Sequence, residues 1–329
     1  MRRALHLAER GKGRVMPNPM VGAVIVHDGL IIGEGYHEQY GGPHAEVNAV
    51  NSVENKDLLK ESTIYVTLEP CAHFGKTPPC AELIVKSQFK KVVVAQLDPH
   101  EKVAGKGMKL IEDAGIETEM GVLEKEARYL NRRFNCFHAE KRPYVILKWA
   151  ETQDGVIGRA EQDKDKSTWM SSNTSKQLVH EMRAHEAAIL IGKNTAIKDN
   201  PSLTVRLTKG DNPLRLVLDQ KNELSDLLNV FNKEAETLRL VEGETIKEWK
   251  NLWEELFKLL FDKGIQSLIV EGGSKVLTDI IEKGMWDEAY KFIAPVKWEI
   301  GVYAPQGISN WELINDHLEG DHLYRAYKW

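Results

Sequence analysis

The sequence predicts an α/β protein that consists of two domains. Its 329 residues exceed the roughly 100–200 residues of a typical single domain. Segments typical of strands and of helices alternate in both halves, and this alternation is characteristic of layered α/β domains. Between the halves, the stretch 139–143 is polar and ends in Pro143, directly after a predicted helix. We therefore expect one domain over residues 1–140 and a second over residues 141–329.

The composition is that of a globular protein, with 42% hydrophobic and 28% charged residues. The net charge of −5 argues against a dedicated nucleic-acid binder, which usually carries a basic surplus. No apolar run approaches the ~18–20 residues of a membrane span. His6 and Glu9 interrupt the segment after the basic start, which argues against a secretory signal. We expect a cytoplasmic protein that binds neither membrane nor nucleic acid.

The first half should contain five strands and five helices. Asp28-Gly29 is a hairpin signal between the first two strands. Apolar residues recur three and four positions apart over residues 123–138, so this segment is predicted as one amphipathic helix. The expected strands are 21–26, 30–36, 63–68, 91–96 and 116–120, and the expected helices are 2–11, 45–53, 81–86, 107–114 and 123–138.

The second half repeats the alternation without sharing a motif with the first. Asp154-Gly155 is predicted as a turn, and residues 199–206 as a turn that leads into a short strand. Asn173 is the expected cap of a helix over 173–184. An apolar stripe from Trp249 to Leu260 has helical spacing and is assigned to core packing. The other expected elements are strands 144–149, 188–191, 215–218, 237–241 and 267–270, and helices 246–261 and 275–283.

The strongest chemical signal is His44-Ala45-Glu46, followed by two cysteines, Cys71 and Cys80, that each come after a proline. One histidine and two cysteines form a three-ligand zinc set whose fourth position is open to water. Glu46 is then suited to carry protons rather than to bind the metal. Zinc deaminases have the signature H-x-E followed by P-C-x-x-C, whereas eight residues separate the two cysteines here.

With its long insert between the cysteines, the sequence resembles the bifunctional deaminase/reductase family of riboflavin biosynthesis. The segments that carry the resemblance are Asn18-Pro19-Met20-Val21-Gly22, His44-Ala45-Glu46 and the whole stretch from Thr67 to Cys80. The resemblance extends over essentially the whole chain. It implies a cytidine-deaminase-like α/β/α domain followed by a dihydrofolate-reductase-like α/β domain.

For the first domain, the resemblance implies that His44, Cys71 and Cys80 bind zinc and that Glu46 transfers protons. Asn18 would bind the pyrimidine ring or the ribose, and the insert would meet the 5′-phosphate of the substrate. His73 and Lys76 suit that phosphate chemically, as compact donors on a turn. Two alternatives stay open: His73 as a competing zinc ligand and Lys76 as a solvated loop residue.

In the second half, Glu271-Gly272-Gly273-Ser274-Lys275 follows a predicted strand and opens a predicted helix. Glycines there let backbone N–H groups approach a phosphate at the helix N-terminus. The stretch is neither a Walker A loop nor a Rossmann fingerprint. From the residues alone, a phosphate or dinucleotide site and a simple helix cap both remain open.

The resemblance also covers this half, through Lys148-Trp149-Ala150, Asp154-Gly155, 167–171, Arg183-Ala184, 192–195 and 199–206. It implies NADPH contacts from Ala150, Trp169, Thr195, Asp199, Gly273, Ser274, Lys275, Val276, Leu277, Thr278 and Asp279. It implies substrate contacts from Ser167, Arg183, Leu203, Arg206 and Glu271. Packing for Trp169 and surface ion pairs for Arg183 and Arg206 are the alternatives. Two departures from the family pattern are Gln153 and the stretch 294–301, which lacks a glycine pair.

The resulting hypothesis is a zinc- and NADPH-dependent enzyme with two activities. It would deaminate a diaminopyrimidinone ribosyl phosphate and then reduce its ribosyl group to ribityl. One rival is a nucleic-acid-editing deaminase with an accessory domain. Another is a second domain that only binds ligand or mediates dimerisation. The resemblance further implies a homo-oligomer that acts on a small-molecule substrate.

Overall fold

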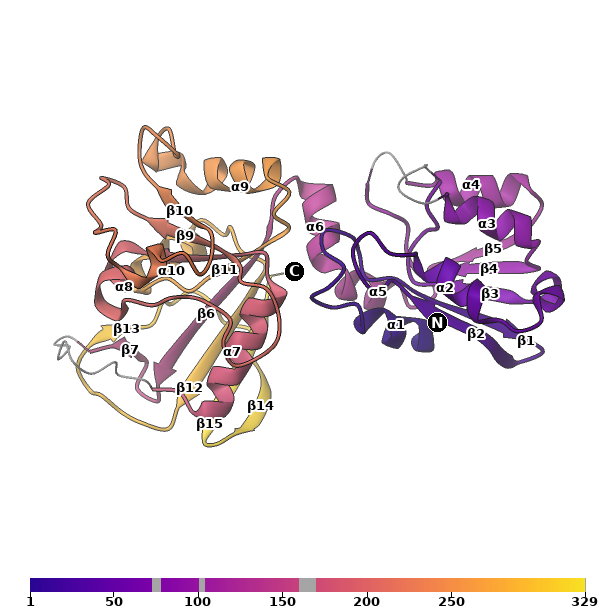
Figure 1. Ribbon diagram of the computed structural model, residues 1–329. Coiled ribbons are helices and arrows are strands. Elements are labelled where there is room, and N and C mark those ends of the chain that lie inside the picture. Colours follow the sequence, from indigo (N-terminus) through magenta and orange to yellow (C-terminus); the bar gives the residue numbers. More distant parts are fainter. Residues whose placement is uncertain (73–77, 101–103, 160–169, 329) are drawn as a thin grey trace. The chain divides into compact units, whose positions relative to one another are not determined.

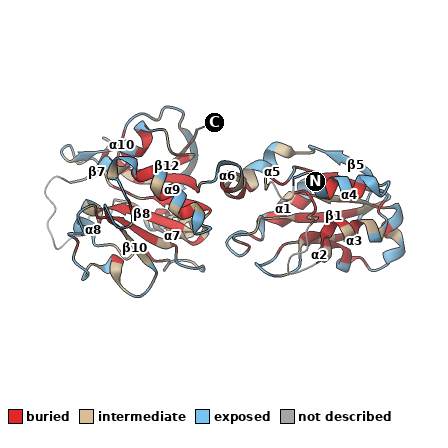
Figure 2. Cartoon of the chain, turned by 90° about the horizontal axis from the view of Figure 1, so that it is seen from above, coloured by how far each residue is buried: buried red, intermediate tan, exposed pale blue. Residues whose placement is uncertain are grey.

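The computed structural model describes residues 1–72, 78–100, 104–159 and 170–328. The chain divides into two compact units, Met1–Lys141 and Arg142–Trp329. The first unit therefore ends one residue after the domain boundary that the sequence predicts. Each unit has its own sheet and its own hydrophobic core (Figures 1 and 2).

The first unit is built on a five-stranded sheet with the order β2-β1-β3-β4-β5. Strand β1 runs antiparallel to both β2 and β3, whereas β3, β4 and β5 are parallel. Parallel neighbours end at the same edge of the sheet, and side chains that follow them lie close together. The strands are β1 (Gly22–His27), β2 (Leu30–Tyr36), β3 (Thr63–Val66), β4 (Lys91–Val94) and β5 (Glu117–Met120).

Helices cover both faces of this sheet. Apolar residues of α2, α3 and α4 share one core with β1, β3 and β4, while α1 packs on Val24 from the other face (Figure 1). The helices are α1 (Arg2–Glu9), α2 (Ala45–Ser52), α3 (Cys80–Ser87), α4 (Lys106–Asp113), α5 (Glu124–Leu130) and α6 (Arg132–Glu140), with a 3₁₀ turn η1 (Lys56–Glu61).

The prediction of one helix over 123–138 is wrong, because α5 and α6 are separate. Asn131 lies between them with φ −100° and ψ 25°. Its carboxamide accepts from the Met20 N–H and donates to the Met20 carbonyl, both at 2.8 Å. This pairing with a distant backbone replaces the continuation of the helix.

The second unit has an eight-stranded sheet with the order β10-β9-β8-β11-β6-β12-β15-β14. From β10 to β12 all neighbours are parallel, and β15 and β14 add an antiparallel edge. Strands β7 (Val156–Gly158) and β13 (Val302–Tyr303) form a separate pair. The main strands are β6 (Tyr144–Thr152), β8 (Ala188–Gly192), β9 (Leu214–Leu218), β10 (Thr237–Leu240), β11 (Ser267–Val270), β12 (Glu288–Ala294), β14 (Glu312–Leu318) and β15 (Asp321–Tyr327).

Helices α9 and α10 pack on one face of this sheet, in the core that contains Val145 and Leu147 of β6. Helix α7 packs with Ala150, Phe292 and their neighbours on the other face. Because side chains alternate along a strand, Lys148 of β6 lies on the α7 face. The helices are α7 (Asn173–His185), α8 (Lys193–Asp199), α9 (Leu252–Asp262) and α10 (Ser274–Glu282), with 3₁₀ turns η2 (Asn229–Phe231) and η3 (Trp249–Asn251).

Three local predictions in this unit are wrong. The cap of α7 is Ser172, whose hydroxyl accepts from the Ser175 N–H at 3.1 Å. The helix expected from Ile246 begins with η3, since Ile246 pairs with Glu242 in a β-bridge. Residues 200–206, all of them described, contain no strand. Within the described residues, no helix is long and apolar enough to cross a bilayer.

Candidate active sites in the two units

Three ligand atoms converge in the first unit, from His44, Cys71 and Cys80, and all lie within 4.8 Å of one another. His44 directly precedes α2, Cys71 follows β3 and a short turn, and Cys80 is the first residue of α3. His44 Nδ1 lies 3.6 Å from Cys71 Sγ and 3.3 Å from Cys80 Sγ. A tetrahedral zinc ion with ordinary bond lengths separates such ligand atoms by ~3.5 Å. The cluster therefore fits zinc.

The surroundings of the two thiols favour a thiolate. The Cys80 N–H, at the start of α3, donates to Cys71 Sγ at 3.3 Å. A hydrogen bond from the Cys80 thiol lowers the pKa of the Cys71 thiol to about 4, and the same bond raises the pKa of Cys80. The helix N-terminus adds positive potential at this end of α3. Cys71 is therefore held as a thiolate, and a bound zinc ion would displace the proton of Cys80.

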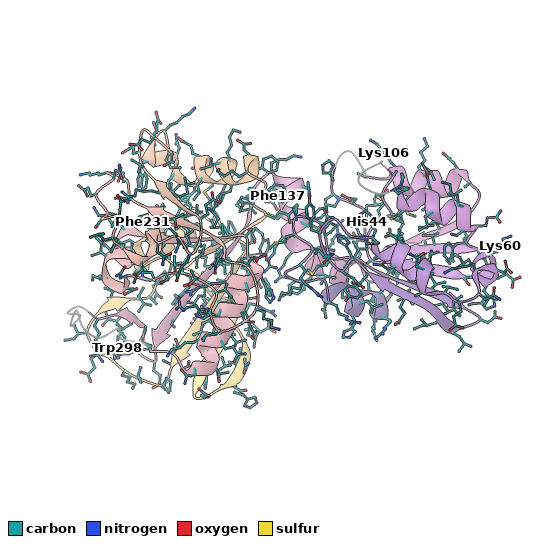
Figure 3. All side chains as sticks on the ribbon, in the orientation of Figure 1. His44, Lys60, Lys106, Phe137, Phe231 and Trp298 are labelled. Carbon is teal, nitrogen blue, oxygen red and sulfur yellow. The ribbon has the colours of Figure 1, made fainter. Side chains whose placement is uncertain are left out.

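Glu46 lies two residues after His44 in the first turn of α2 and is only 3% exposed. Burial raises the pKa of its carboxyl to about 7, and the nearby Cys71 thiolate adds to this shift. A carboxyl with a pKa near neutrality both accepts and releases protons at physiological pH. Figure 3 shows His44 among the side chains of this unit.

Asn18 belongs to a chain of hydrogen bonds that reaches the segment before His44. His37 Nδ1 donates to the Pro43 carbonyl at 3.0 Å, because that carbonyl can only accept. His37 Nε2 is therefore the acceptor for the Asn18 amide, 3.1 Å away. The His37 ring lies edge-on to that of His44 with centroids 5.5 Å apart. This arrangement leaves the Asn18 carbonyl oxygen available as an acceptor.

Sequence reasoning missed Glu69, which anchors the loop after β4. Glu69 is 4% exposed and immediately precedes Pro70 and Cys71. Its carboxylate acts as a cap from outside the helix, because α4 has no side-chain cap of its own. It accepts backbone N–H groups of Asp98, Gly105, Gly107 and Met108 at 2.9–3.3 Å. An acid within the apolar end of a strand was the available signal.

In the second unit, Lys148, Arg183 and Glu271 form a buried cluster of charges. Arg183 donates to the Glu271 carboxylate through Nε at 3.2 Å and Nη2 at 2.7 Å. Lys148 Nζ lies 3.5 Å from the same carboxylate, and the three side chains are only 10–12% exposed. Val270, the last residue of β11, pairs with Leu147, so Glu271 follows the strand beside Lys148 of β6.

The charged groups in this cluster shift one another's pKa values. Burial alone would raise the pKa of Glu271, but Arg183 and Lys148 outweigh it and bring the pKa to about 2. Burial lowers the pKa of Lys148, which prepares this amine to give up a proton. Sequence reasoning quoted Lys148 in a motif without giving it a role. A lysine inside an otherwise apolar strand was the signal.

Two helix N-termini meet at the carboxyl ends of β8 and β11. A Cβ at Gly273 would lie 3.4 Å from the Thr195 hydroxyl, so the two predicted cofactor residues are neighbours. Val276 lies against Gly192 and Gly272, where a Cβ would meet it at 2.8 and 2.7 Å. Open α/β sheets bind cofactors at this kind of edge. Glu271 does not cap α10, whose N-cap is Gly273.

The remaining predicted residues differ in what their side chains do. Leu277 is fully buried in the core with α9, and Asp279 accepts from Trp253 Nε1 at 2.5 Å. Leu203 is buried with φ +55°, and Arg206 and Asp199 are exposed. Of the predicted cofactor residues between Gly273 and Asp279, four are left as candidates for direct cofactor contact: Gly273, Ser274, Lys275 and Thr278. His73, Lys76, Ser167 and Trp169 lie outside the described residues.

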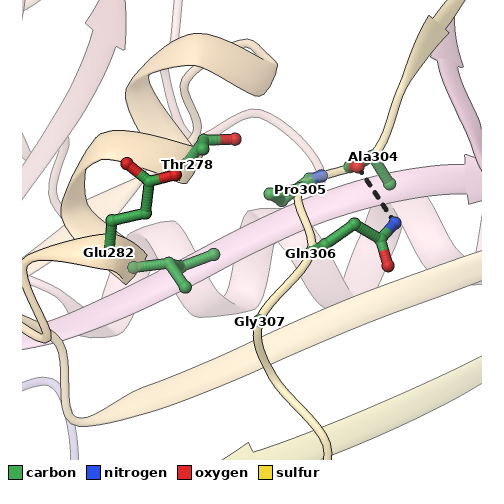
Figure 4. A pocket seen from close by; sticks show the side chains of 7 residues that line it. Thr278, Glu282, Ala304, Pro305, Gln306 and Gly307 are labelled. Carbon is green, nitrogen blue, oxygen red and sulfur yellow. Dashed lines mark hydrogen bonds between the residues drawn. The ribbon is translucent and has the colours of Figure 1, made fainter.

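A cavity of about 430 Å³ lies beside α10 (Figure 4). Among the residues that line the cavity, Thr278 is the one predicted to contact the cofactor. The loop that contains Gln306 lines it as well. Gln306 donates to the Ala304 carbonyl at 3.3 Å, which shapes this loop. The cavity is not formed by the Lys148–Arg183–Glu271 cluster. The lining residues are Thr278, Ile281, Glu282, Ala304, Pro305, Gln306 and Gly307.

Together, the two sites define a zinc-binding deaminase domain followed by a reductase domain. Residues 1–96 match the family model for the cytidine and deoxycytidylate deaminase zinc-binding region. Residues 143–297 match the model for the RibD C-terminal domain. These matches confirm the predicted fold class and the expected zinc of the first domain.

The chain belongs to the RibD family of riboflavin biosynthesis proteins. It is 43% identical over 311 residues to RibD of Aquifex aeolicus, covering 90% of this chain and 86% of that protein. It is 39% identical to RibD of Bacillus amyloliquefaciens over 328 residues, covering 94% and 87%. The chain is thus a bifunctional deaminase and reductase of riboflavin biosynthesis.

A crystal structure from Thermotoga maritima has the same overall architecture, with a TM-score of 0.87 and 38% identity. The match covers 100% of this chain and 97% of the Thermotoga maritima chain. That protein is described as a diaminohydroxyphosphoribosylaminopyrimidine deaminase/5-amino-6-(5-phosphoribosylamino)uracil reductase. Acinetobacter baumannii RibD is similar as well, with a TM-score of 0.86 and 32% identity.

Proposed function

We propose that the enzyme deaminates 2,5-diamino-6-(5-phosphoribosylamino)pyrimidin-4(3H)-one and then reduces the product to 5-amino-6-(5-phosphoribitylamino)uracil. The convergence of His44, Cys71 and Cys80 beside the buried Glu46 carries the first half of this proposal. The Lys148–Arg183–Glu271 cluster carries the second half.

In the deamination, His44, Cys71 and Cys80 would hold the metal, and a set of three protein ligands would leave room for water. When bound, zinc supplies Lewis-acid activation of that water. Glu46 would accept one proton from the attacking water and pass it to the ring nitrogen, and then accept the second proton from the hydroxyl now bonded to the ring carbon and pass it to the departing ammonia. Its carboxyl, with a pKa near 7, suits both directions of transfer.

Asn18 orients the pyrimidine in this step. Its amide donates to His37, so its carbonyl oxygen accepts an N–H of the ring. His73 and Lys76 remain proposed contacts of the 5′-phosphate. A charged donor suits a phosphate dianion, and the insert lies between the two cysteine ligands in the sequence.

In the reduction, NADPH supplies a hydride to C1′ of the ribosyl group. Ring opening to the imine moves a proton from the nitrogen to the ring oxygen, and addition of hydride to C1′ then requires one further proton at the imine nitrogen, so a proton carrier is needed nearby. Lys148 fits this role, since its ammonium is buried and its pKa is lowered. Glu271 stays ionised and orients Lys148 and Arg183. Arg183, Arg206, Leu203 and Ser167 are the proposed substrate contacts.

For the cofactor, we assign Ala150, Trp169, Thr195, Asp199 and the start of α10 from Gly273 onward. The adjacency of Thr195 and Gly273 supports this assignment. The N–H groups of the first turn of α10 and its dipole favour the pyrophosphate there. Val276 and Leu277 contribute through packing that positions this turn.

We also propose a homo-oligomer that acts in the cytoplasm. Strand β14 forms one edge of the sheet and exposes Leu313 and Ile314, at 46% and 37%. The unpaired N–H and C=O groups of an exposed edge strand are suited to pairing with a second copy. Light scattering after size-exclusion chromatography tests the mass. A monomer at micromolar concentration would contradict this part.

One coupled assay tests the two activities. Purified enzyme receives the diaminopyrimidinone phosphate, first without and then with NADPH. We expect ammonia release in the first case and, on addition of NADPH, a loss of its absorbance. Ammonia release from RNA cytidines in place of this substrate would instead support a nucleic-acid-editing deaminase. If the enzyme does not oxidise NADPH when the deaminated intermediate is supplied, the reductase assignment is contradicted.

A further inference from the structure

The segment from Asn200 to Arg206 follows α8 and contains two proposed substrate contacts, Leu203 and Arg206. It forms neither helix nor strand, so its shape depends on side chains from elsewhere. Asn229 donates to the Asn200 side chain at 2.7 Å and to its carbonyl at 3.0 Å. The buried Arg215 donates to the Ser202 carbonyl at 2.9 Å. These contacts hold the beginning of the segment.

The end of the segment is attached to α7. The Arg206 N–H donates to His180 Nδ1 at 3.0 Å, and His180 is only 5% exposed. Nη1 of the Arg206 guanidinium donates to the Thr204 hydroxyl at 2.9 Å. Arg206 itself is exposed, so the rest of its guanidinium is accessible to a ligand. His180 thus holds the backbone of a residue whose side chain is free to bind.

His180 is suited to be a permanent acceptor. Accepting at Nδ1 requires a neutral imidazole with its proton on Nε2. Burial, together with the Arg183 and Arg206 cations, lowers the pKa of His180 to about 4. Glu271 and Lys148 also act on this ring, with opposite signs. The imidazole therefore stays neutral at physiological pH, and the acceptor is retained.

His180 also shares a helix face with Arg183. The two residues are three positions apart on α7, and such residues are neighbours on a helix. Arg183 is fixed by two hydrogen bonds to Glu271. The position of Arg206 relative to Arg183 is therefore set through one helical turn and one hydrogen bond.

We infer that His180 is a positioning residue of the reductase site, which holds the Arg206 backbone so that Arg206 and Arg183 bind the same substrate. This inference rests on the proposed function, in which both arginines contact the ribosyl phosphate. It predicts that His180 affects substrate affinity through Arg206 and has no effect on NADPH affinity.

The test uses steady-state reduction of 5-amino-6-(5-phosphoribosylamino)uracil by the full-length enzyme. His180→Leu removes the acceptor and should raise KM for this substrate about tenfold, with kcat and the NADPH KM within about threefold. His180→Asn places an amide oxygen near the Nδ1 position and should restore KM to within about threefold. His185→Leu, at the end of the same helix, is the matched control and should leave KM unchanged.

A double-mutant cycle separates the inference from its premise. Arg206→Ala should raise KM, and adding His180→Leu to it should cost nothing further, because both changes remove one interaction. Additive losses, or an unchanged KM in His180→Leu while Arg206→Ala is costly, would overturn the role of His180 alone. An unchanged KM in Arg206→Ala would remove Arg206 from the substrate site and the inference with it. If His180→Leu fails to fold, a wild-type KM in His180→Ala would overturn the inference, and a raised KM that His180→Asn restores would uphold it.

Discussion

Glu46 in the first unit and Glu271 in the second are both buried carboxyls beside a reaction site, yet they differ in their partners. Glu46 has a thiolate nearby and a pKa of about 7. Glu271 has Arg183 and Lys148 within 3.5 Å and a pKa of about 2. Burial acts in the same direction on both. The comparison shows that neighbouring charge decides whether a buried carboxyl carries a proton or holds cations in place.

The largest effect should come from the metal ligands. Cys71→Ser or Cys80→Ser should lower the zinc content from about one per chain to near zero and reduce deamination to background, because a hydroxyl does not replace a soft thiolate. Elemental analysis and an ammonia assay measure both. Cys136→Ser, at a buried cysteine outside the cluster, is the control. Full zinc in either ligand variant would remove that cysteine from the site.

Glu46→Gln should have the second largest effect on activity. The amide cannot accept a proton, so deamination should fall by about 10²–10⁴-fold while zinc is retained. Reduction of the deaminated intermediate should stay within twofold or so of wild type, since the two chemistries use different units. A small loss of deamination would mean that Glu46 is not the proton carrier. The contrast drawn between Glu46 and Glu271 would then be wrong for Glu46.

Glu271→Gln should have an intermediate effect. It leaves Lys148 and Arg183 buried without an anion, and hydride transfer should fall roughly 10- to 100-fold because both cations lose their orientation. Stopped-flow single turnovers at saturating NADPH measure this rate. The affinity for NADPH should change only a few-fold. A wild-type rate together with a lower melting temperature would make Glu271 a structural residue only.

The smallest effect concerns pH. His138 in the first unit and His180 in the second have a folded-state pKa lowered to about 4, chiefly by burial. In the unfolded chain these histidines have pKa values of about 6.5. Between pH 4 and pH 6.5, roughly, the unfolded chain therefore binds more protons than the folded protein, so the free energy of unfolding falls as the pH drops through this range. Each histidine should contribute on the order of 1–3 kcal/mol.

Urea denaturation at several pH values measures this slope. His138→Gln should flatten it for the transition of the first unit, and His180→Asn for the second. Unchanged slopes in both variants would show that other groups govern acid unfolding.

The sequence was sufficient for features that depend on local pattern. The alternating apolar runs predict most strands, and the spacing of His44, Glu46, Cys71 and Cys80 predicts a cluster that the structure brings together. It was insufficient where distant segments decide. The break at Asn131 depends on the Met20 backbone, 111 residues away. The role proposed for Lys148 depends on Glu271, which follows the neighbouring strand, and that proposed for His180 depends on the Arg206 N–H.

The antiparallel edge formed by β15 and β14 was also missed. These strands follow a stretch without clear periodicity, and β14 is mostly exposed, so its side chains carry no alternation to detect. Within the sequence motif at residues 271–275, the choice between cap and ligand site depended on where Glu271 points. Its ion pairs with Arg183 and Lys148 show that the carboxylate points away from a capping role, and contact with a ligand there stays a prediction.

The most direct test of the contrast between the two carboxyls measures both activities in both variants. Ammonia release from the diaminopyrimidinone phosphate and single-turnover oxidation of NADPH by the deaminated intermediate are recorded for Glu46→Gln and for Glu271→Gln, with zinc content determined for each. We predict that Glu46→Gln loses only ammonia release and Glu271→Gln only NADPH oxidation. Loss of both activities in either folded, zinc-loaded variant, or the retention of both, would contradict the assignment of a proton carrier to one unit and a fixed charge to the other.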